Sequence, residues 1–160
     1  MIGFCVSPHP TVLVSFCGYG DITGAWYSKP DPYYCTKPLV PVEEATGTPK
    51  AQRLYLYYRQ HGLWPKEVTG HDPEKEPKIF DPWCPLRNVT KEYPPIILVH
   101  GDKDNDVPYE QSVMMAKELK AKGVEHEFVT LPNGEHGFNK GDNLDKLCRE
   151  TQNFLDKHLK

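Results

Sequence analysis

Three short apolar runs along the chain each lie next to turn-forming residues. Residues 11–16 are rich in β-branched side chains and precede glycines, residues 96–99 follow two prolines, and residues 125–131 precede a Pro-Asn-Gly turn. Runs of this length and composition predict buried strands. Because they are nearly continuous rather than alternating, they are typical of a parallel sheet that is covered on both faces.

Helical periodicity follows the second and the third run. Residues 109–122 contain good helix formers with an apolar stripe, and Gly123 stands where a helix-terminating glycine belongs. Residues 144–159 repeat apolar side chains at helical spacing, which predicts a terminal helix packed on the sheet. The sequence therefore predicts a β-α-β-α segment over residues 95–160.

Residues 18–94 differ in kind from the rest of the chain. They hold 11 of the 16 prolines and 12 of the 18 aromatic residues, with one clear helix predicted at residues 51–61. This composition predicts a compact, irregular insertion between two strands, of the sort that can form a lid over a site. Its aromatic residues either face a substrate or pack the insertion's own small core, and both interpretations stay open for Trp26, Tyr27, Trp64 and Trp83.

Length and charge narrow the class of protein. A chain of 160 residues with 38% hydrophobic residues holds one partial or complete domain, with the first strand in residues 1–17, the insertion in 18–94 and the remainder in 95–160. A net charge of -3 without clustered lysines and arginines argues against nucleic acid as a partner. No run reaches the roughly 18 apolar residues of a membrane span, and the N-terminal residues lack the pattern of a signal peptide. We expect a cytoplasmic protein.

The five cysteines are odd in number and contain no C-x-x-C pair. This arrangement indicates neither a disulfide framework nor a zinc site, because both need closely organised sets of cysteines. We therefore expect reduced thiols, most of them buried, and no metal.

Two polar side chains follow neighbouring predicted strands. Asp104 lies in the loop after residues 96–99, and His136, with a glycine two positions before it and one directly after it, lies in the loop after residues 125–131. Because the carboxyl ends of parallel strands meet at one edge of a sheet, we expect Asp104 and His136 to pair. A carboxylate beside an imidazole fixes its tautomer and stabilises the imidazolium that forms when the ring takes a proton from an alcohol. The sequence thus predicts an acid–base pair.

The stretch Pro-Pro-Ile-Ile-Leu-Val-His-Gly-Asp-Lys-Asp-Asn-Asp-Val-Pro and the later Leu-Pro-Asn-Gly-Glu-His-Gly-Phe resemble the C-terminal part of the α/β-hydrolase superfamily. Its prolyl-oligopeptidase-like and dienelactone-hydrolase-like esterase branch is nearest. The resemblance implies an α/β fold of about three parallel strands with flanking helices and a lid insertion. It also implies hydrolysis of ester or peptide bonds through a Ser-His-Asp triad, with no metal or organic cofactor. The acid falls on Asp104 and the base on His136.

The family's Gly-x-Ser-x-Gly elbow and its glycine-rich oxyanion loop are both missing from this sequence. None of the serines has two flanking glycines: Ser7, Ser15, Ser28 and Ser112. The resemblance therefore implies a C-terminal fragment of a serine hydrolase that supplies the Asp and the His and is inactive alone. It also implies that residues 11–16 leave a bare apolar strand edge, which favours association.

Two other classes of function stay open. A hydrolase that has lost its nucleophile could serve as a non-catalytic binding module, with the strand edge docking a partner. Residues 102–113 begin like the D-x-D-x-D of a calcium loop, but Val107, Pro108 and Val113 stand where that loop needs a glycine, a carbonyl ligand and a bidentate glutamate. The sequence therefore weighs against a calcium site.

Overall fold

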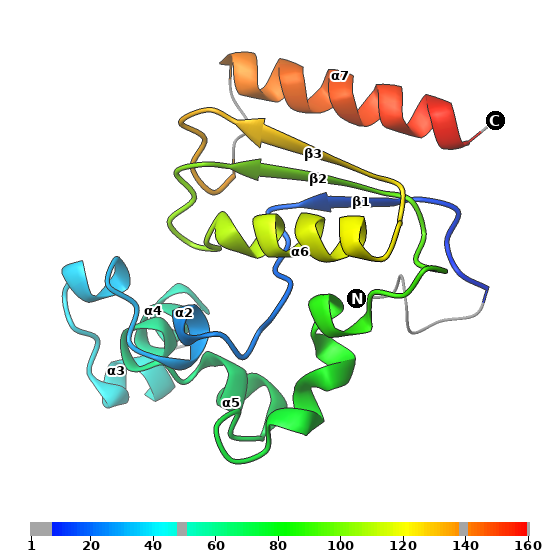
Figure 1. Cartoon of the computed structure of the whole chain (residues 1–160). Coiled ribbons are helices and arrows are strands. Elements are labelled where there is room, and N and C mark those ends of the chain that lie inside the picture. Colours follow the sequence, from blue (N-terminus) through cyan, green and yellow to red (C-terminus); the bar gives the residue numbers. More distant parts are fainter. Residues whose placement is uncertain (1–7, 48–50, 138–140, 160) are drawn as a thin grey trace. The chain divides into compact units, whose positions relative to one another are not determined.

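The computed structural model describes residues 8–47, 51–137 and 141–159 (Figure 1). The chain divides into two compact units. One contains the segment up to Asp21 together with the segment from Pro82 onward, and the other is Ile22–Asp81. The segment predicted as an insertion thus contains the whole of the second unit, while its two flanks belong to the first.

The first unit is built on a three-stranded parallel sheet in the order β1-β2-β3. The strands are β1 (Leu13–Phe16), β2 (Ile96–Gly101) and β3 (His126–Leu131), so each of the three predicted strands is present with ends shifted by no more than two residues. Phe16 of β1 lies opposite Val99 of β2, and Gly101 lies opposite the last residue of β3. The carboxyl ends of all three strands therefore lie at one edge of the sheet.

Helices α6 (Glu110–Ala121) and α7 (Gly141–His158) cover opposite faces of this sheet (Figure 1). On the α6 side the buried cluster consists of Val89, Tyr93, Ile96, Leu98, Met115, Leu119 and Val124. On the α7 side it consists of Ile97, Val99, Leu131 and Phe154. Successive residues of β2 are thus buried on alternate faces, which explains why its sequence is continuously apolar.

The end of α6 shows how sequence sets an element boundary. Gly123 has a φ of 70°, in the left-handed region that favours glycine, and the N–H of Val124 donates to the carbonyl of Leu119 at 2.9 Å. This is the Schellman arrangement, and Leu119 and Val124 also share the apolar cluster beneath the helix. The predicted helix and its terminating glycine are confirmed.

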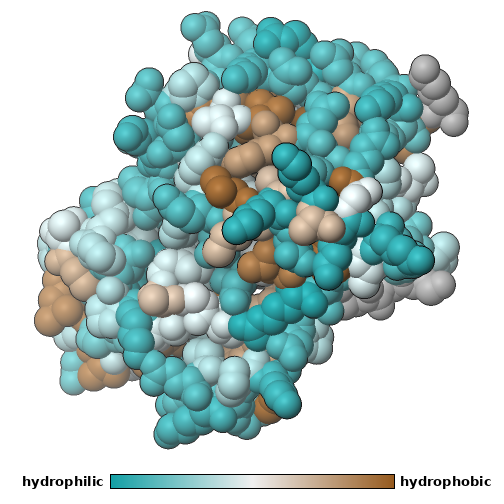
Figure 2. All heavy atoms as spheres, in the orientation of Figure 1, coloured by the Kyte–Doolittle hydropathy of each residue, from teal (hydrophilic) through white to brown (hydrophobic). Residues whose placement is uncertain are grey.

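The outer strand of the sheet leaves apolar side chains exposed. Within the described residues β1 pairs with β2 only, and Val14 and Phe16 are 39% and 47% exposed. Figure 2 shows one face of the molecule, which is covered mainly by hydrophilic residues with smaller apolar areas among them. No helix in the described part of the chain combines the length and apolarity needed to cross a bilayer.

The second unit consists of short helices. These are α2 (Ala25–Ser28), η1 (Tyr34–Thr36), α3 (Val42–Gly47), α4 (Ala51–His61), α5 (Trp64–Thr69) and most of η2 (Pro77–Trp83). The helix α4 has the predicted bounds. The rings of Trp26 and Tyr27 stack with centroids 4.1 Å apart, and Trp64 packs against Tyr27 and Tyr55. These three of the four singled-out aromatics therefore contribute to the unit's own core.

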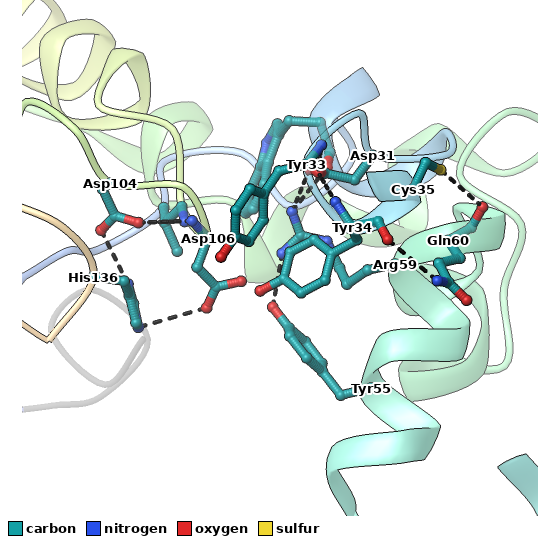
Figure 3. A network of polar contacts seen from close by, with 12 residues as sticks. Asp31, Tyr33, Tyr34, Cys35, Tyr55, Arg59, Gln60, Asp104, Asp106 and His136 are labelled. Carbon is teal, nitrogen blue, oxygen red and sulfur yellow. Dashed lines mark hydrogen bonds and ion pairs between the residues drawn. The ribbon is translucent and has the colours of Figure 1, made fainter. Parts of the chain in front are cut away.

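The core of the second unit is organised around a buried arginine of α4. Arg59 is 1% exposed; its Nη2 donates to the Oδ2 of Asp31 at 2.6 Å and its Nη1 donates to the hydroxyl of Tyr55 at 2.7 Å (Figure 3). The rings of Tyr27 and Tyr34 lie 4.7 and 4.5 Å from the guanidinium carbon. A buried charge is tolerated when it is paired and hydrogen-bonded in this way, and a planar guanidinium also suits aromatic neighbours.

We expect the substitution Arg59→Lys to destabilise this unit by about 1–2 kcal/mol, because lysine keeps the charge beside Asp31 but loses the forked donors and the planar stacking. The same substitution at Arg53, whose ion pair with Glu44 is exposed, should change stability by less than about 0.5 kcal/mol. Urea unfolding followed by tryptophan fluorescence compares the two variants. Equal effects at the two positions would contradict the role assigned to Arg59.

The cysteines differ in part from the sequence prediction. All four that the structure describes are free, as expected, but Cys35 and Cys148 are exposed while Cys17 and Cys84 are buried. Only half of the described thiols are buried, so the expectation that most of them are buried is wrong. Cys35 lies in the surface turn η1, and Cys148 lies on the outer side of α7. Cys5 lies outside the described residues.

Candidate active site

Asp104 and His136 meet at the carboxyl-end edge of the sheet. The Nδ1 of His136 lies 2.9 Å from the Oδ2 of Asp104, and the two loops that carry them follow β2 and β3 (Figure 3). Because a carboxylate only accepts hydrogen bonds, Nδ1 carries the hydrogen and donates it, which leaves Nε2 as the basic nitrogen of a neutral ring. The juxtaposition predicted from the sequence is present.

Two glycines allow the two loops to approach this closely. A Cβ atom at Gly101 would lie 2.2 Å from the carbonyl oxygen of Gly134, and the N–H of Lys103 donates to that same oxygen at 2.9 Å. Backbone therefore contacts backbone where a side chain has no room. The glycine of the His-Gly-x-x-Asp motif is explained by this contact.

The carboxylate of Asp104 is buried and fully engaged. Its side chain has no exposed surface, and its Oδ1 accepts hydrogen bonds from the N–H groups of Asp106 and Val107, both at 2.9 Å. Burial alone would raise the pKa of Asp104, but the hydrogen bonds from His100, from the backbone N–H groups and from His136 lower it well below its usual range. Asp104 is therefore ionised and held in place, as a residue that orients a base must be.

His100 supports the carboxylate, and the sequence prediction missed it. Its ring is completely buried, with Nε2 2.9 Å from the carbonyl oxygen of Val107 and 3.3 Å from the Oδ2 of Asp104. Since the carbonyl only accepts, Nε2 carries the hydrogen and Nδ1 accepts from the hydroxyl of Ser112 at 2.7 Å. Its place as the first residue of the His-Gly-x-x-Asp motif was the available signal. The same contact shows that Ser112 is buried and engaged rather than open to a substrate.

Cys17 also reaches the site, from the end of β1. It is 9% exposed, its φ of 48° is unusual for a residue other than glycine, and its N–H donates to the carbonyl of Val99 at 3.0 Å. Burial and the adjacent carboxylate of Asp104 raise the pKa of the Cys17 thiol to about 12. The thiol is therefore protonated at neutral pH, which argues against Cys17 as a substitute nucleophile. Cys17 directly follows β1, so the rule that functional side chains lie at the carboxyl ends of parallel strands also points to this residue.

The two other aspartates of the motif have separate contacts. The Oδ1 of Asp102 accepts the N–H of Asn133 at 2.7 Å, which joins the loops after β2 and β3. The Oδ2 of Asp106 lies 3.5 Å from the Nε2 of His136. Within the described residues Asp102, Asp104 and Asp106 do not form a group with metal-binding spacing, so the structure gives no support to a calcium loop.

The state of Asp104 gives a prediction about acid stability. Because its pKa is lowered in the folded chain, it stabilises the fold above the ordinary aspartate pKa of about 3.9, and this contribution is lost as pH falls toward the folded pKa. We expect the unfolding free energy of the chain to fall more steeply below pH 4 than that of Asp104→Asn. Urea unfolding at pH 3 and pH 6 measures this, and parallel pH dependence of the two proteins would contradict it.

Comparison with known proteins shows which protein family this chain belongs to. The profile of the prolyl oligopeptidase family matches residues 19–160, and the chain belongs to that family. It adopts part of the α/β-hydrolase fold. The chain is 30% identical over 72 residues to esterase LipC of Mycobacterium tuberculosis, which is 44% of this chain and 18% of the esterase.

Two solved structures show the same fold. A truncated carbohydrate esterase from gut microbiota matches with a TM-score of 0.59 and 26% identity, over 95% of this chain and 44% of the esterase. An acylaminoacyl peptidase, solved in complex with the chloromethyl ketone of Z-Gly-Gly-Phe, matches with a TM-score of 0.66 and 19% identity, over 99% of this chain and 21% of the peptidase. The chain thus spans less than half the length of these proteins. An esterase and a peptidase thus share its fold.

Proposed function

We propose that this chain supplies the acid, Asp104, and the base, His136, of a Ser-His-Asp triad that hydrolyses esters or peptide bonds. The observation that carries the proposal is the 2.9 Å contact between His136 Nδ1 and the buried carboxylate of Asp104, at the sheet edge where strands β2 and β3 end. Membership of a hydrolase family supports it. A cytoplasmic location stays a prediction from the sequence.

The geometry supports a distinct role for each group. The Nε2 of His136 takes the proton of a serine hydroxyl as that oxygen attacks the carbonyl carbon, and later gives it to the leaving group. Asp104 keeps the hydrogen on Nδ1 and stabilises the imidazolium. His100 is a positioning residue, because it contacts Asp104 through a fixed Nε2–H and not the reacting atoms.

The attacking serine and the oxyanion donors come from residues that this sequence does not contain. No Gly-x-Ser-x-Gly is present among the 160 residues, so the isolated chain should have no hydrolase activity. We call a protein the "elbow-bearing enzyme" when it contains both this chain and a segment with that motif, and when that segment packs against the exposed edge of β1. Val14 and Phe16 on β1 are the exposed apolar residues that such a segment would cover.

A fluorophosphonate probe tests the proposal, since it labels activated serines. The purified 160-residue chain should stay unlabelled, and the elbow-bearing enzyme should be labelled on the serine of its Gly-x-Ser-x-Gly. Labelling of Ser15, Ser28 or Ser112 in the isolated chain would overturn the division of roles proposed here.

The exposed edge of β1 also favours a second candidate, a binding module derived from a hydrolase. Apolar strand edges dock partners by adding a strand. The reading frame upstream of Met1 discriminates between the two: an in-frame Gly-x-Ser-x-Gly favours the enzyme, and an in-frame stop codon close upstream favours the binding module.

A further inference from the structure

The thiol at the site has a ligand-forming geometry that the hydrolytic reaction does not use. The Sγ of Cys17, a carboxylate oxygen of Asp104 and a ring nitrogen of His136 all lie within 4.8 Å of one another. Cys17 follows β1, Asp104 follows β2 and His136 follows β3. The three parallel strands therefore bring the three ligands to the same edge of the sheet. Thiolate, imidazole and carboxylate together suit borderline-soft cations such as Zn²⁺ and are unlike the all-oxygen shells of Ca²⁺ and Mg²⁺.

The distances fit a small tetrahedral ion. Bonds of 2.0–2.3 Å place the ligands of such an ion about 3.5 Å apart. The Oδ2 of Asp104 and the Nδ1 of His136 are 2.9 Å apart, and the ligand atoms of all three residues lie within 4.8 Å of one another, so small side-chain rotations bring them to these positions. The His136 side chain is 43% exposed, so an ion can enter from solvent and keep a fourth position for water.

The surrounding contacts orient these ligands. The Oδ1 of Asp104 accepts hydrogen bonds from the N–H groups of Asp106 and Val107, which fix the carboxylate. The Nε2 of His100 lies 3.3 Å from the Oδ2, the oxygen that faces His136. The second ring nitrogen of His136 lies 3.5 Å from the Oδ2 of Asp106. A carboxylate behind a ligating histidine is the usual outer contact of zinc sites.

We propose that Cys17, Asp104 and His136 form a binding site for Zn²⁺ or a similar thiophilic divalent cation, and that the bound ion blocks the acid–base pair. The inhibition rests on the function proposed above, whereas the binding does not. On binding, the thiol proton leaves to solvent, and the proton on His136 Nδ1 moves to Nε2, where Asp106 accepts its hydrogen bond. One thiolate and one carboxylate then balance the two charges of the ion.

Cobalt substitution tests the site in the 160-residue chain, because a thiolate ligand gives Co²⁺ a charge-transfer absorption in the near ultraviolet. We expect one equivalent of Co²⁺ to produce this band under reducing conditions and Zn²⁺ to displace it. Cys17→Ser should abolish the band and weaken Zn²⁺ binding at least 100-fold, since loss of an outer contact alone costs about 10–100-fold. His136→Gln, a change to an exposed side chain, should also weaken Zn²⁺ binding.

Two other thiols provide matched controls. Cys35→Ser and Cys148→Ser alter exposed cysteines that do not belong to the group of three ligands, so the band and the Zn²⁺ affinity should be unchanged. Absence of a one-to-one complex, or a band that survives in Cys17→Ser, would overturn the metal site. Because the readout is spectroscopic, this result is independent of whether the elbow-bearing enzyme hydrolyses a substrate.

Discussion

His136→Ala in the elbow-bearing enzyme should lower kcat/KM by about 10⁶-fold, the order of the loss found when the histidine of a Ser-His-Asp triad is removed. The reason is that Nε2 of His136 is the nitrogen left without a hydrogen when Nδ1 donates to Asp104. Asp104→Asn should cost less, about 10⁴-fold, because the base remains but an amide can donate to Nδ1 and so favour the wrong tautomer. The double variant should be little worse than His136→Ala alone, since the two residues act as a unit.

A histidine at the other end of β3 is the matched control. His126 stands at the start of β3, at the opposite end from His136, and its Nδ1 contacts the carbonyl oxygen of its own neighbour Val124 at 2.8 Å. His126→Ala should leave kcat/KM within a few-fold of the parent. Steady-state kinetics with a chromogenic ester measure both variants. If the two substitutions cost equal factors, the role assigned to His136 is wrong.

Gly101→Ala should destabilise the chain by about 3 kcal/mol and separate Asp104 from His136. The added methyl group would lie 2.2 Å from the carbonyl oxygen of Gly134, a backbone atom that cannot rotate away. The loops after β2 and β3 must therefore move apart, and forcing atoms into a packed contact costs about 1–3 kcal/mol or more.

Gly20→Ala is the control for this substitution. The Cβ atom there would meet its nearest neighbours at 3.4 Å, close to ordinary van der Waals contact, so we expect a change below about 1 kcal/mol. Urea unfolding of the isolated chain gives both values. A Gly101→Ala variant as stable as Gly20→Ala would show that the close approach of the two loops is not required.

The sheet and the dyad could be predicted because their signals are local and regular. The strand runs, the helix ending at Gly123 and the placement of Asp104 and His136 after neighbouring strands all follow from short stretches of sequence and the geometry of parallel sheets. Their role in catalysis stays a prediction.

The rest of the site depends on long-range packing, which a single sequence does not reveal. In the sequence His100 looks like the last residue of an apolar strand. Its contacts with Ser112 and Val107 become visible only in the structure. Cys17 contributes through a turn with an uncommon φ and through burial against Asp104. The packing of Trp26 and Tyr27 around Arg59, with Trp64 against Tyr27, is likewise one of two open interpretations of the sequence, because an aromatic-rich segment looks the same whether its rings face inward or outward.

The tautomer of His136 tests the central claim most directly. Long-range ¹⁵N–¹H correlation spectra of the isolated chain at pH 9 distinguish a hydrogen on Nδ1 of a neutral histidine ring from one on Nε2. We predict a hydrogen on Nδ1 in the parent chain and its loss from Nδ1 in Asp104→Asn. A hydrogen on Nε2 in the parent, unaffected by Asp104→Asn, would contradict the pairing of Asp104 with His136 and the hydrolase function derived from it.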